Sequence, residues 1–296
     1  MCNLFENSVF RSVIFINCIT SVIRNCEFRD IYATNSNGGA ISIQSSCKNV
    51  FVSICTFTNC LATLEGGAIY SDSYNLTLSR LCFSNCSIVS SSQYGIATRT
   101  THNGYYIMNY VSSSDCPSYS APKLHCCFLP KSGNQNTLNT NVSRNSVSWN
   151  SGSHHWEFAS STIKFYLVLN SHCGEAVGVS CAYQRPQDHS HCMIVNNTVS
   201  NGCIWCLNCH VYFSDSVFLR CNRNIGHLTN AQLTVSNSFI DSSIPTNGII
   251  AQNIVQTHEF FTPSFTIHVL PCVNGITYGY IPKPQIPFTL LYIIIG

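Results

Sequence analysis

Short runs of alternating apolar and polar residues predict β-strands along this chain. In Asn75-Leu-Thr-Leu-Ser79 the two kinds of side chain alternate with the period of two that a half-buried strand requires. No segment carries the sustained apolar stripe of an amphipathic helix, which recurs at a period of about 3.6 residues. The pattern therefore predicts an all-β protein.

These strand-sized runs recur along the chain. Gly38-Gly39-Ala40-Ile41 returns as Gly66-Gly67-Ala68-Ile69, and the segment 49–57 returns at a similar interval as 75–83. Segment 21–28 is a shortened earlier copy. Strands that repeat at such a period without intervening helices are typical of a parallel β-solenoid in which each repeat winds one coil. The Leu-x-x-Leu-x-Leu spacing of a leucine-rich repeat, the competing architecture at this period, is absent.

A second recurring step combines phenylalanine, asparagine and cysteine. It occurs at Phe15–Cys18, Phe57–Cys60 and Phe83–Cys86. Inward phenylalanine side chains can stack from coil to coil at a strand spacing of about 4.8 Å. Asparagine at a bend can form a hydrogen-bonded ladder, because its amide group is both donor and acceptor. The double glycines supply turn residues with positive φ.

The repeat divides the chain into two parts. We expect a right-handed parallel β-helix over 1–261, with its least regular, loop-like part at 113–140, where Ser, Pro and Asn are frequent. Five prolines after Phe261 predict an extended tail over 262–296, ending in a short apolar segment at 288–296. That segment is shorter than the roughly 20 residues of a membrane span. A membrane is therefore a partner only if this apolar segment is a truncated span.

The composition is unusual mainly in its low content of charged residues. Only 9% of the residues are charged, against about 25% in typical proteins, so neutral Ser, Asn and Thr must solvate the surface. The formal net charge is +2 and the basic residues form no cluster, which argues against a nucleic-acid partner. The first residues lack the basic start and long apolar run of a signal peptide.

The glycine tetrads and phenylalanine steps resemble the repeats of the polymorphic outer-membrane-protein (Pmp-like) family, whose repeats build a right-handed, pectin-lyase-like β-helix. The resemblance is specific over about 10–100, thematic to 260, and absent from the tail. It implies a cell-surface or secreted adhesin or antigen whose motifs are structural. One departure stands out: Cys18, Cys60 and Cys86 occupy the fourth position of the step, where the family has Asn. A ladder of thiols or a Cys60–Cys86 disulfide would then replace the Asn ladder.

Nineteen cysteines and four Asn-x-Ser/Thr sequences offer further candidate sites. The odd cysteine count leaves at least one thiol outside any intrachain disulfide. Possible N-glycosylation sites are Asn75, Asn85, Asn141 and Asn196.

The sharpest metal-like motif is Cys203-Ile-Trp-Cys206-Leu-Asn-Cys209-His210. Its second half matches the c-type haem attachment pattern, and the whole matches zinc-ligand spacing. Residues three apart in a strand point to opposite faces, so these side chains converge only at a turn. Because cysteine is so frequent here, we interpret them as core thiols or disulfides and expect no metal and no cofactor.

The sequence thus favours a non-enzymatic scaffold that presents a polar face of Ser, Asn, Thr and Tyr to host proteins or glycans. The alternative is a carbohydrate-active β-helix enzyme, either a lyase or a glycoside hydrolase. Hydrolysis needs two carboxylates in one cleft, for which Asp215 and Asp241 are the best candidates among twelve acidic residues. A third interpretation is a non-functional gene fragment of a surface protein.

Overall fold

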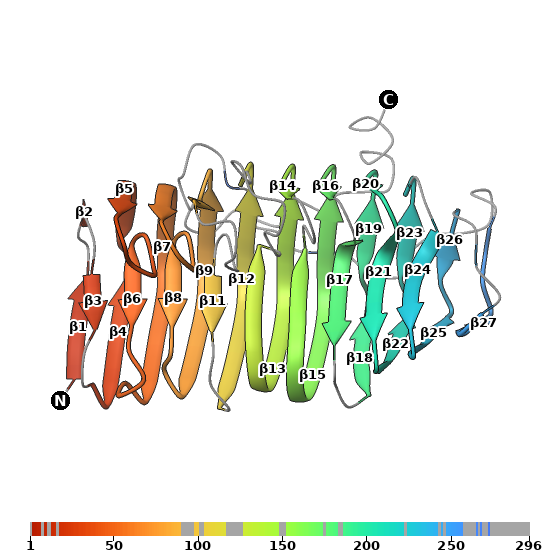
Figure 1. Ribbon diagram of the computed structural model, residues 1–296, viewed down its shortest axis with the longest axis horizontal. Coiled ribbons are helices and arrows are strands. Elements are labelled where there is room, and N and C mark those ends of the chain that lie inside the picture. Colours follow the sequence, from red (N-terminus) through yellow and green to blue (C-terminus); the bar gives the residue numbers. More distant parts are fainter. Residues whose placement is uncertain are drawn as a thin grey trace.

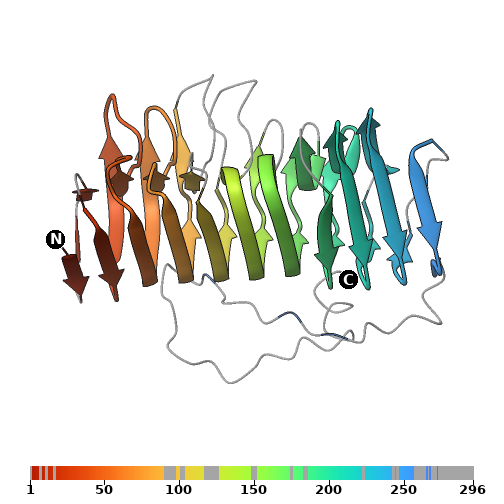
Figure 2. The same cartoon turned by 90° about the horizontal axis from the view of Figure 1, so that it is seen from below.

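The computed structural model is a parallel β-solenoid, which confirms the predicted all-β architecture (Figure 1). It describes residues 2–256 except 7–8, 11–12, 16–17, 90–97, 101–103, 117–126, 148–151, 174–175, 183–185, 222–223, 242–243 and 245–246, and also Phe265, Ile267 and Cys272. Strand pairs are parallel throughout the described part, and successive coils stack along the long axis of the molecule (Figures 1 and 2).

Sheet one forms one side of the coils. Its strands, in stacking order, are β1 (Cys2–Glu6), β4 (Thr20–Arg24), β7 (Asn49–Ala62), β9 (Asn75–Ser84), β12 (Tyr105–Ser114), β13 (Phe128–Ser143), β15 (Ser153–Leu169), β18 (Gln187–Ser190), β22 (His210–Ser214), β25 (Gln232–Ser236) and β27 (Ile249–Gln252). The longer strands bend at a corner and continue into sheet two.

Sheet two follows that corner. It contains the second halves of β7, β9, β12, β13 and β15, together with β2 (Val9–Phe10), β5 (Glu27–Ala33), β19 (Met193–Val195), β23 (Val217–Leu219) and β26 (Phe239–Ile240). Beyond a second corner lie the short strands β10 (Ser87–Ile88), β14 (Ser146–Val147), β16 (His172–Cys173) and β20 (Thr198–Val199).

Sheet three closes each coil. It contains the first residues of β13 and β15, together with β3 (Val13–Phe15), β6 (Ile41–Ile43), β8 (Ile69–Ser71), β11 (Thr98–Thr100), β17 (Ala176–Ala182), β21 (Gly202–Leu207) and β24 (Asn224–Thr229). The glycine tetrads lead into this sheet, and Ile41 pairs with Ile69 as the recurrence of the tetrad predicts.

The two glycines of each tetrad serve different purposes. Gly38 and Gly66 have φ angles of 72° and 63°, a conformation that side chains with a Cβ rarely adopt. Gly39 lies so close to the next coil that a Cβ would stand 2.0 Å from the carbonyl oxygen of Gly67. The first glycine thus makes the turn, and the second allows close approach of the coils.

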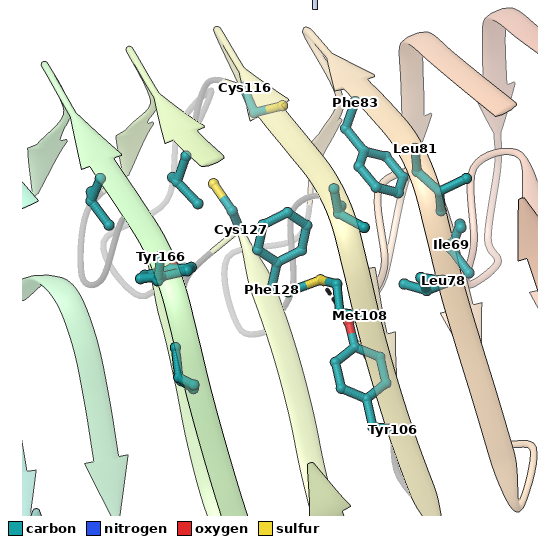
Figure 3. Packing of buried hydrophobic residues seen from close by; sticks show 14 of the residues in the cluster. Ile69, Leu78, Leu81, Phe83, Tyr106, Met108, Cys116, Cys127, Phe128 and Tyr166 are labelled. Carbon is teal, nitrogen blue, oxygen red and sulfur yellow. Dashed lines mark hydrogen bonds between the residues drawn. The ribbon is translucent and has the colours of Figure 1, made fainter. Parts of the chain in front are cut away.

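The core is a set of columns in which equivalent residues stack from coil to coil. The rings of Phe28, Phe57 and Phe83 lie parallel, with centroids 4.9 and 4.8 Å apart. Phe128 continues the stack edge-on, 6.1 Å from Phe83. Figure 3 shows Phe83, Met108 and Phe128 filling the interior from β9, β12 and β13. Stacked rings of this kind contribute about 0.5–1.5 kcal/mol per pair beyond their buried area.

This register corrects one predicted repeat. The residue that stacks on Phe57 from the preceding coil is Phe28, as the shortened copy at 21–28 predicts. Phe15 instead pairs with Ile43 in sheet three, so Phe15–Cys18 does not repeat Phe57–Cys60. The two steps have similar sequences, but they lie on different sides of the coil.

The loop-like interpretation of 113–140 is also wrong where the chain is described. Residues 113–114 end β12 and 128–140 belong to β13, while 117–126 lie outside the described residues. The polar residues of β13 fit the interior because they bond to one another: Gln135 Nε2 donates to Thr137 Oγ1 at 2.8 Å. Buried polar groups that are hydrogen-bonded do not prevent a strand from packing inward.

Three residues of the predicted tail lie against the solenoid. Ile267 is buried and Phe265 packs beside it on the outside of sheet two, and Cys272 is joined to Cys82 of β9 by a disulfide. We call these three residues the strap. The rest of 262–296, including the apolar segment 288–296, lies outside the described residues.

Candidate functional site

The outward side of sheet one is the candidate binding surface, and we call it the ladder face. Strand alternation sends every second residue of this sheet to the solvent. The outward residues of its first column are Thr20, Asn49, Asn75, Tyr105, Asn134 and Ser160. Those of its second column are Val22, Phe51, Thr77, Ile107, Asn136, Thr162, Asp188, Tyr212, Thr234 and Ile250. Neutral polar and aromatic side chains dominate both columns.

Hydrogen bonds between coils hold the polar side chains of this face in place. Asn75 Nδ2 donates to Asn49 Oδ1 at 2.8 Å, and Asn75 Oδ1 accepts the backbone N–H of Tyr105 at 3.0 Å. Further along, Ser160 Oγ donates to Asn134 Oδ1 at 2.8 Å. Side chains that are already ordered lose less conformational freedom when a partner binds.

Exposed large apolar side chains lie along the ladder face. Phe51, Tyr105 and Ile107 lie on β7 and β12, Tyr212 and Ile250 lie nearer the C-terminal end, and Ile19 and Tyr74 lie one residue outside the edge of the face. Contiguous exposed apolar groups rimmed by polar ones mark interaction sites on soluble proteins. The sequence predicts a polar face with tyrosine but not these apolar side chains; the signal that would reveal them is apolar residues at outward strand positions.

The outward side of sheet two is partly covered by the strap, at the coils near its C-terminal end and at Cys82. Its coils at the C-terminal end carry an outward apolar stripe, made of Leu167, Met193, Val195, Val217, Leu219 and Phe239. Ile267 is buried in this stripe, and Phe265 lies 5.0 Å from the His191 ring. On coils nearer the N-terminus, the outward column that contains Leu167 continues with Ser112 and Cys82. Cys82 forms the disulfide with the strap.

The two corners of sheet two hold residues in the left-handed conformation. At the second corner Asn59 and Asn85 have φ angles of 55° and 51°, and Asn85 Nδ2 donates to Asn59 Oδ1 at 2.7 Å. Asn170 and Asn196 repeat this bond at 2.6 Å. Asparagine tolerates this conformation better than most residues, which explains its recurrence there. The Asn ladder is therefore present, immediately before the cysteines.

Buried cysteines occupy the next column, which points inward. The column contains Ile31, Cys60, Cys86, Cys116, Asn145, Ser171, Asn197 and Cys221. Cys60 and Cys86 are thiols in contact with each other, so the thiol ladder, and not the Cys60–Cys86 disulfide, is the form observed. Burial raises the pKa of the Cys86 and Cys116 thiols well above the ordinary value, which keeps them protonated.

Cys18 does not belong to this column. It forms a disulfide with Cys47, its neighbour on the following coil, at a third corner of the coil. Cys18 is therefore not equivalent in the coil to Cys60 and Cys86.

The metal-like motif divides into separate pairs. Cys203 and Cys206 lie buried in β21, where Cys203 contacts Cys221 and Cys206 contacts Cys209. The hydrogen bond from Cys206 lowers the pKa of the Cys209 thiol. His210 is exposed at the start of β22. Within the described residues, no three His, Cys, Asp or Glu side chains gather as metal ligands.

The carboxylates of the enzyme alternative lie at different corners. Asp215 is the left-handed residue before β23, and its backbone N–H donates to Ser236 O at 3.1 Å. Asp241 follows β26, and its Oδ2 accepts the backbone N–H of Arg220 at 2.7 Å. Because Ser214 pairs with Ser236, the position that follows Asp215 on the next coil is Asn237, and Asp241 lies further along that coil. The two carboxylates do not form a stacked pair.

Among the candidate glycosylation residues, Asn75, Asn85 and Asn196 use their side-chain amide nitrogens as ladder donors. Asn141 lies in β13, and its Oδ1 atom is buried. N-glycosylation at these four positions stays a prediction.

Comparison with known proteins adds no relationship: no protein-family model, curated protein or solved structure matches the chain. The described part of the chain contains no helix long and apolar enough to cross a membrane.

Proposed function

We propose that the protein is a non-enzymatic binding scaffold that presents the ladder face to a host protein or glycan. The observation that carries the proposal is the combination, on one face, of hydrogen-bonded Asn side chains with exposed Phe51, Tyr105 and Ile107. Tyrosine offers a large and rigid contact surface, and neighbouring Asn and Ser offer adaptable hydrogen bonds, a composition typical of binding surfaces.

The resemblance to Pmp-like repeats supports the same proposal. Members of that family are right-handed, pectin-lyase-like β-helices that act as adhesins or antigens, and we propose the same role for this protein at the cell surface or in the extracellular space. Ladders of the kind expected for such repeats support the proposal: Asn85 Nδ2 donates to Asn59 Oδ1, and the backbone N–H of Cys116 donates to Asn145 Oδ1. Their role in the fold is to stiffen the stack, so that the ladder face keeps its shape.

A binding experiment tests this function. Purified protein is titrated onto host cells, extracellular-matrix proteins and a glycan array. Saturable binding is expected, and the variant Tyr105→Ala, Ile107→Ser should reduce it at least tenfold, as truncation at an interface centre costs about 2 kcal/mol or more. Tyr32→Ala is the matched control, because Tyr32 is 56% exposed and Tyr105 58%, but Tyr32 lies beyond the second corner.

The outcomes separate the possibilities. Loss of binding in the ladder-face variant but not in Tyr32→Ala supports the proposal, and binding that both variants keep contradicts the assignment of the face. Release of reducing or unsaturated sugar from a polysaccharide panel would contradict the non-enzymatic function.

A further inference from the structure

Cys26 and Cys55 lie at equivalent positions on consecutive coils. The register pairs the residues that flank them, Ile23 with Val52 and Phe28 with Phe57. The backbone N–H of Thr56 donates to Cys26 O at 3.0 Å, which ties the two coils together at this point. Both side chains are buried just after the first corner.

A disulfide already joins the same two coils at another corner. Cys18 and Cys47 have a sequence separation of 29, the same interval as Cys26 and Cys55, and their Cα atoms are 4.4 Å apart. Disulfides accept Cα–Cα distances of roughly 4.4–6.8 Å, and neighbouring strands lie about 4.8 Å apart. The spacing between coils in this solenoid is therefore compatible with a coil-to-coil disulfide.

The thiols of Cys26 and Cys55 contact each other and have the same orientation. Each donates to the carbonyl two residues before it, Cys26 to Arg24 O and Cys55 to Ser53 O, both at 3.1 Å. The following coil offers Cys55 no alternative, because its neighbour there is Leu81. In the column of Cys60, Cys86 and Cys116, by contrast, the middle thiol has a neighbour on either side.

We propose that Cys26 and Cys55 are a modification site, closing to a second coil-to-coil disulfide when the chain folds with oxidised glutathione as oxidant. The Cys55 thiolate attacks glutathione disulfide, which forms a mixed disulfide and releases one glutathione thiolate. Cys26 then loses its proton and attacks the protein sulfur, and the second glutathione leaves. Two thiol hydrogens and the corresponding two electrons pass to the glutathione disulfide, giving two molecules of glutathione.

The reaction belongs to folding and not to the finished protein. Burial raises the pKa of the Cys55 thiol to about 12, so this thiol is protonated at pH 7 in the folded state. While the coils assemble, their register already brings the two thiols next to each other, but the thiols are not yet buried. The folded, reduced protein should therefore resist glutathione disulfide.

The experiment uses the whole chain. The protein is denatured, fully reduced and refolded with a glutathione redox pair, its remaining thiols are alkylated, and a tryptic digest is analysed without reduction. Cleavage after Arg24 and Lys48 separates Cys18 from Cys26 and Cys47 from Cys55. The Cys18–Cys47 link is the internal reference for successful refolding.

We expect a Cys26–Cys55 link at a yield comparable to that of Cys18–Cys47, with a mass loss of about 2 Da for each bond. Cys60 shares the tryptic peptide of Cys55, so Cys60→Ser is analysed in parallel and should keep the link. Cys26→Ser should convert Cys55 to the alkylated form. Alkylated Cys26 and Cys55 beside an intact Cys18–Cys47 link, or a link from Cys55 to another cysteine, would overturn the proposal.

Discussion

Cys86 and Asn145 make the same contact two coils apart. Cys86 Sγ donates to Phe57 O at 3.5 Å, and Asn145 Nδ2 donates to Ser113 O at 3.4 Å. In both cases the acceptor belongs to the preceding coil and stacks on the residue three positions before the donor. Cys60, Asn197 and Cys221 repeat this contact at 3.1–3.7 Å. Thiol and amide thus have one role in this column.

This shared role predicts that Cys86→Asn is tolerated. The amide can reach the same carbonyl, so the free energy of unfolding should change by less than about 1 kcal/mol. Cys86→Ala removes the donor and leaves a void, and should cost about 1–3 kcal/mol. Urea unfolding of the three proteins measures the difference. Equal destabilisation by Asn and Ala would show that the thiol is not an amide substitute.

The phenylalanine stack predicts a large cost for truncation at its centre. Phe57→Ala removes a fully buried ring that contacts both Phe28 and Phe83, and should cost about 3–5 kcal/mol. Phe51→Ala is the matched control on the same strand, because Phe51 faces the solvent and its loss should cost less than about 1 kcal/mol. Thermal or urea unfolding distinguishes the two. Similar costs would contradict the assigned register.

Much of the architecture could be predicted because a solenoid repeats its local rules in every coil. The glycine tetrads and the segments 49–57 and 75–83 stack in the structure as their spacing predicts. The prediction that Phe15–Cys18 repeats Phe57–Cys60 is wrong because the same short sequence occurs on different sides of the coil. Only the strand pairing shows on which side each copy lies. Spacing alone also misplaced Asp241, since the coils near the C-terminal end are shorter than those that carry the tetrads.

The candidate surfaces were harder to predict than the coils. Strand alternation shows that Phe51 and Ile107 share a face, but it does not show which face is covered. Ile267 covers the C-terminal stripe of sheet two, and the strap bonds to Cys82 across a separation of 190 residues. No local sequence pattern encodes a contact between residues so far apart in the chain. The cysteine count does not show which cysteines pair as disulfides.

His189 predicts a loss of stability in acid. It is buried between Ile163 and Phe213 with Nε2 3.3 Å from Gln187 Oε1, and burial lowers its pKa to about 3. Between the ordinary pKa of about 6.5 and pH 3, the unfolded chain binds a proton that the folded chain excludes. The contribution of neutral His189 to the free energy of unfolding is therefore fully present above pH 6.5. Below that pH it is lost at about 1.4 kcal/mol per pH unit.

The variant His189→Leu isolates this contribution, because leucine suits an interior column that holds Ile163 on the preceding coil. Its unfolding free energy should fall less steeply than that of the wild type between pH 6 and pH 4. Exposed His210→Gln is the control and should keep the wild-type slope. Parallel pH profiles for His189→Leu and the wild type would contradict a buried neutral imidazole.

The strap predicts that Met193 is protected from oxidation by the Cys82–Cys272 disulfide. Met193 faces outward in the stripe that Ile267 covers, whereas Met108 lies inside the solenoid. Cys272→Ser, or mild reduction, should release the strap and raise the rate at which hydrogen peroxide oxidises Met193 several-fold, as methionine oxidation follows exposure. Met108 should keep its rate, because its protection comes from the coils themselves. Peptide mass spectrometry reads both residues in one sample, and an unchanged Met193 rate would mean that the strap does not depend on its disulfide.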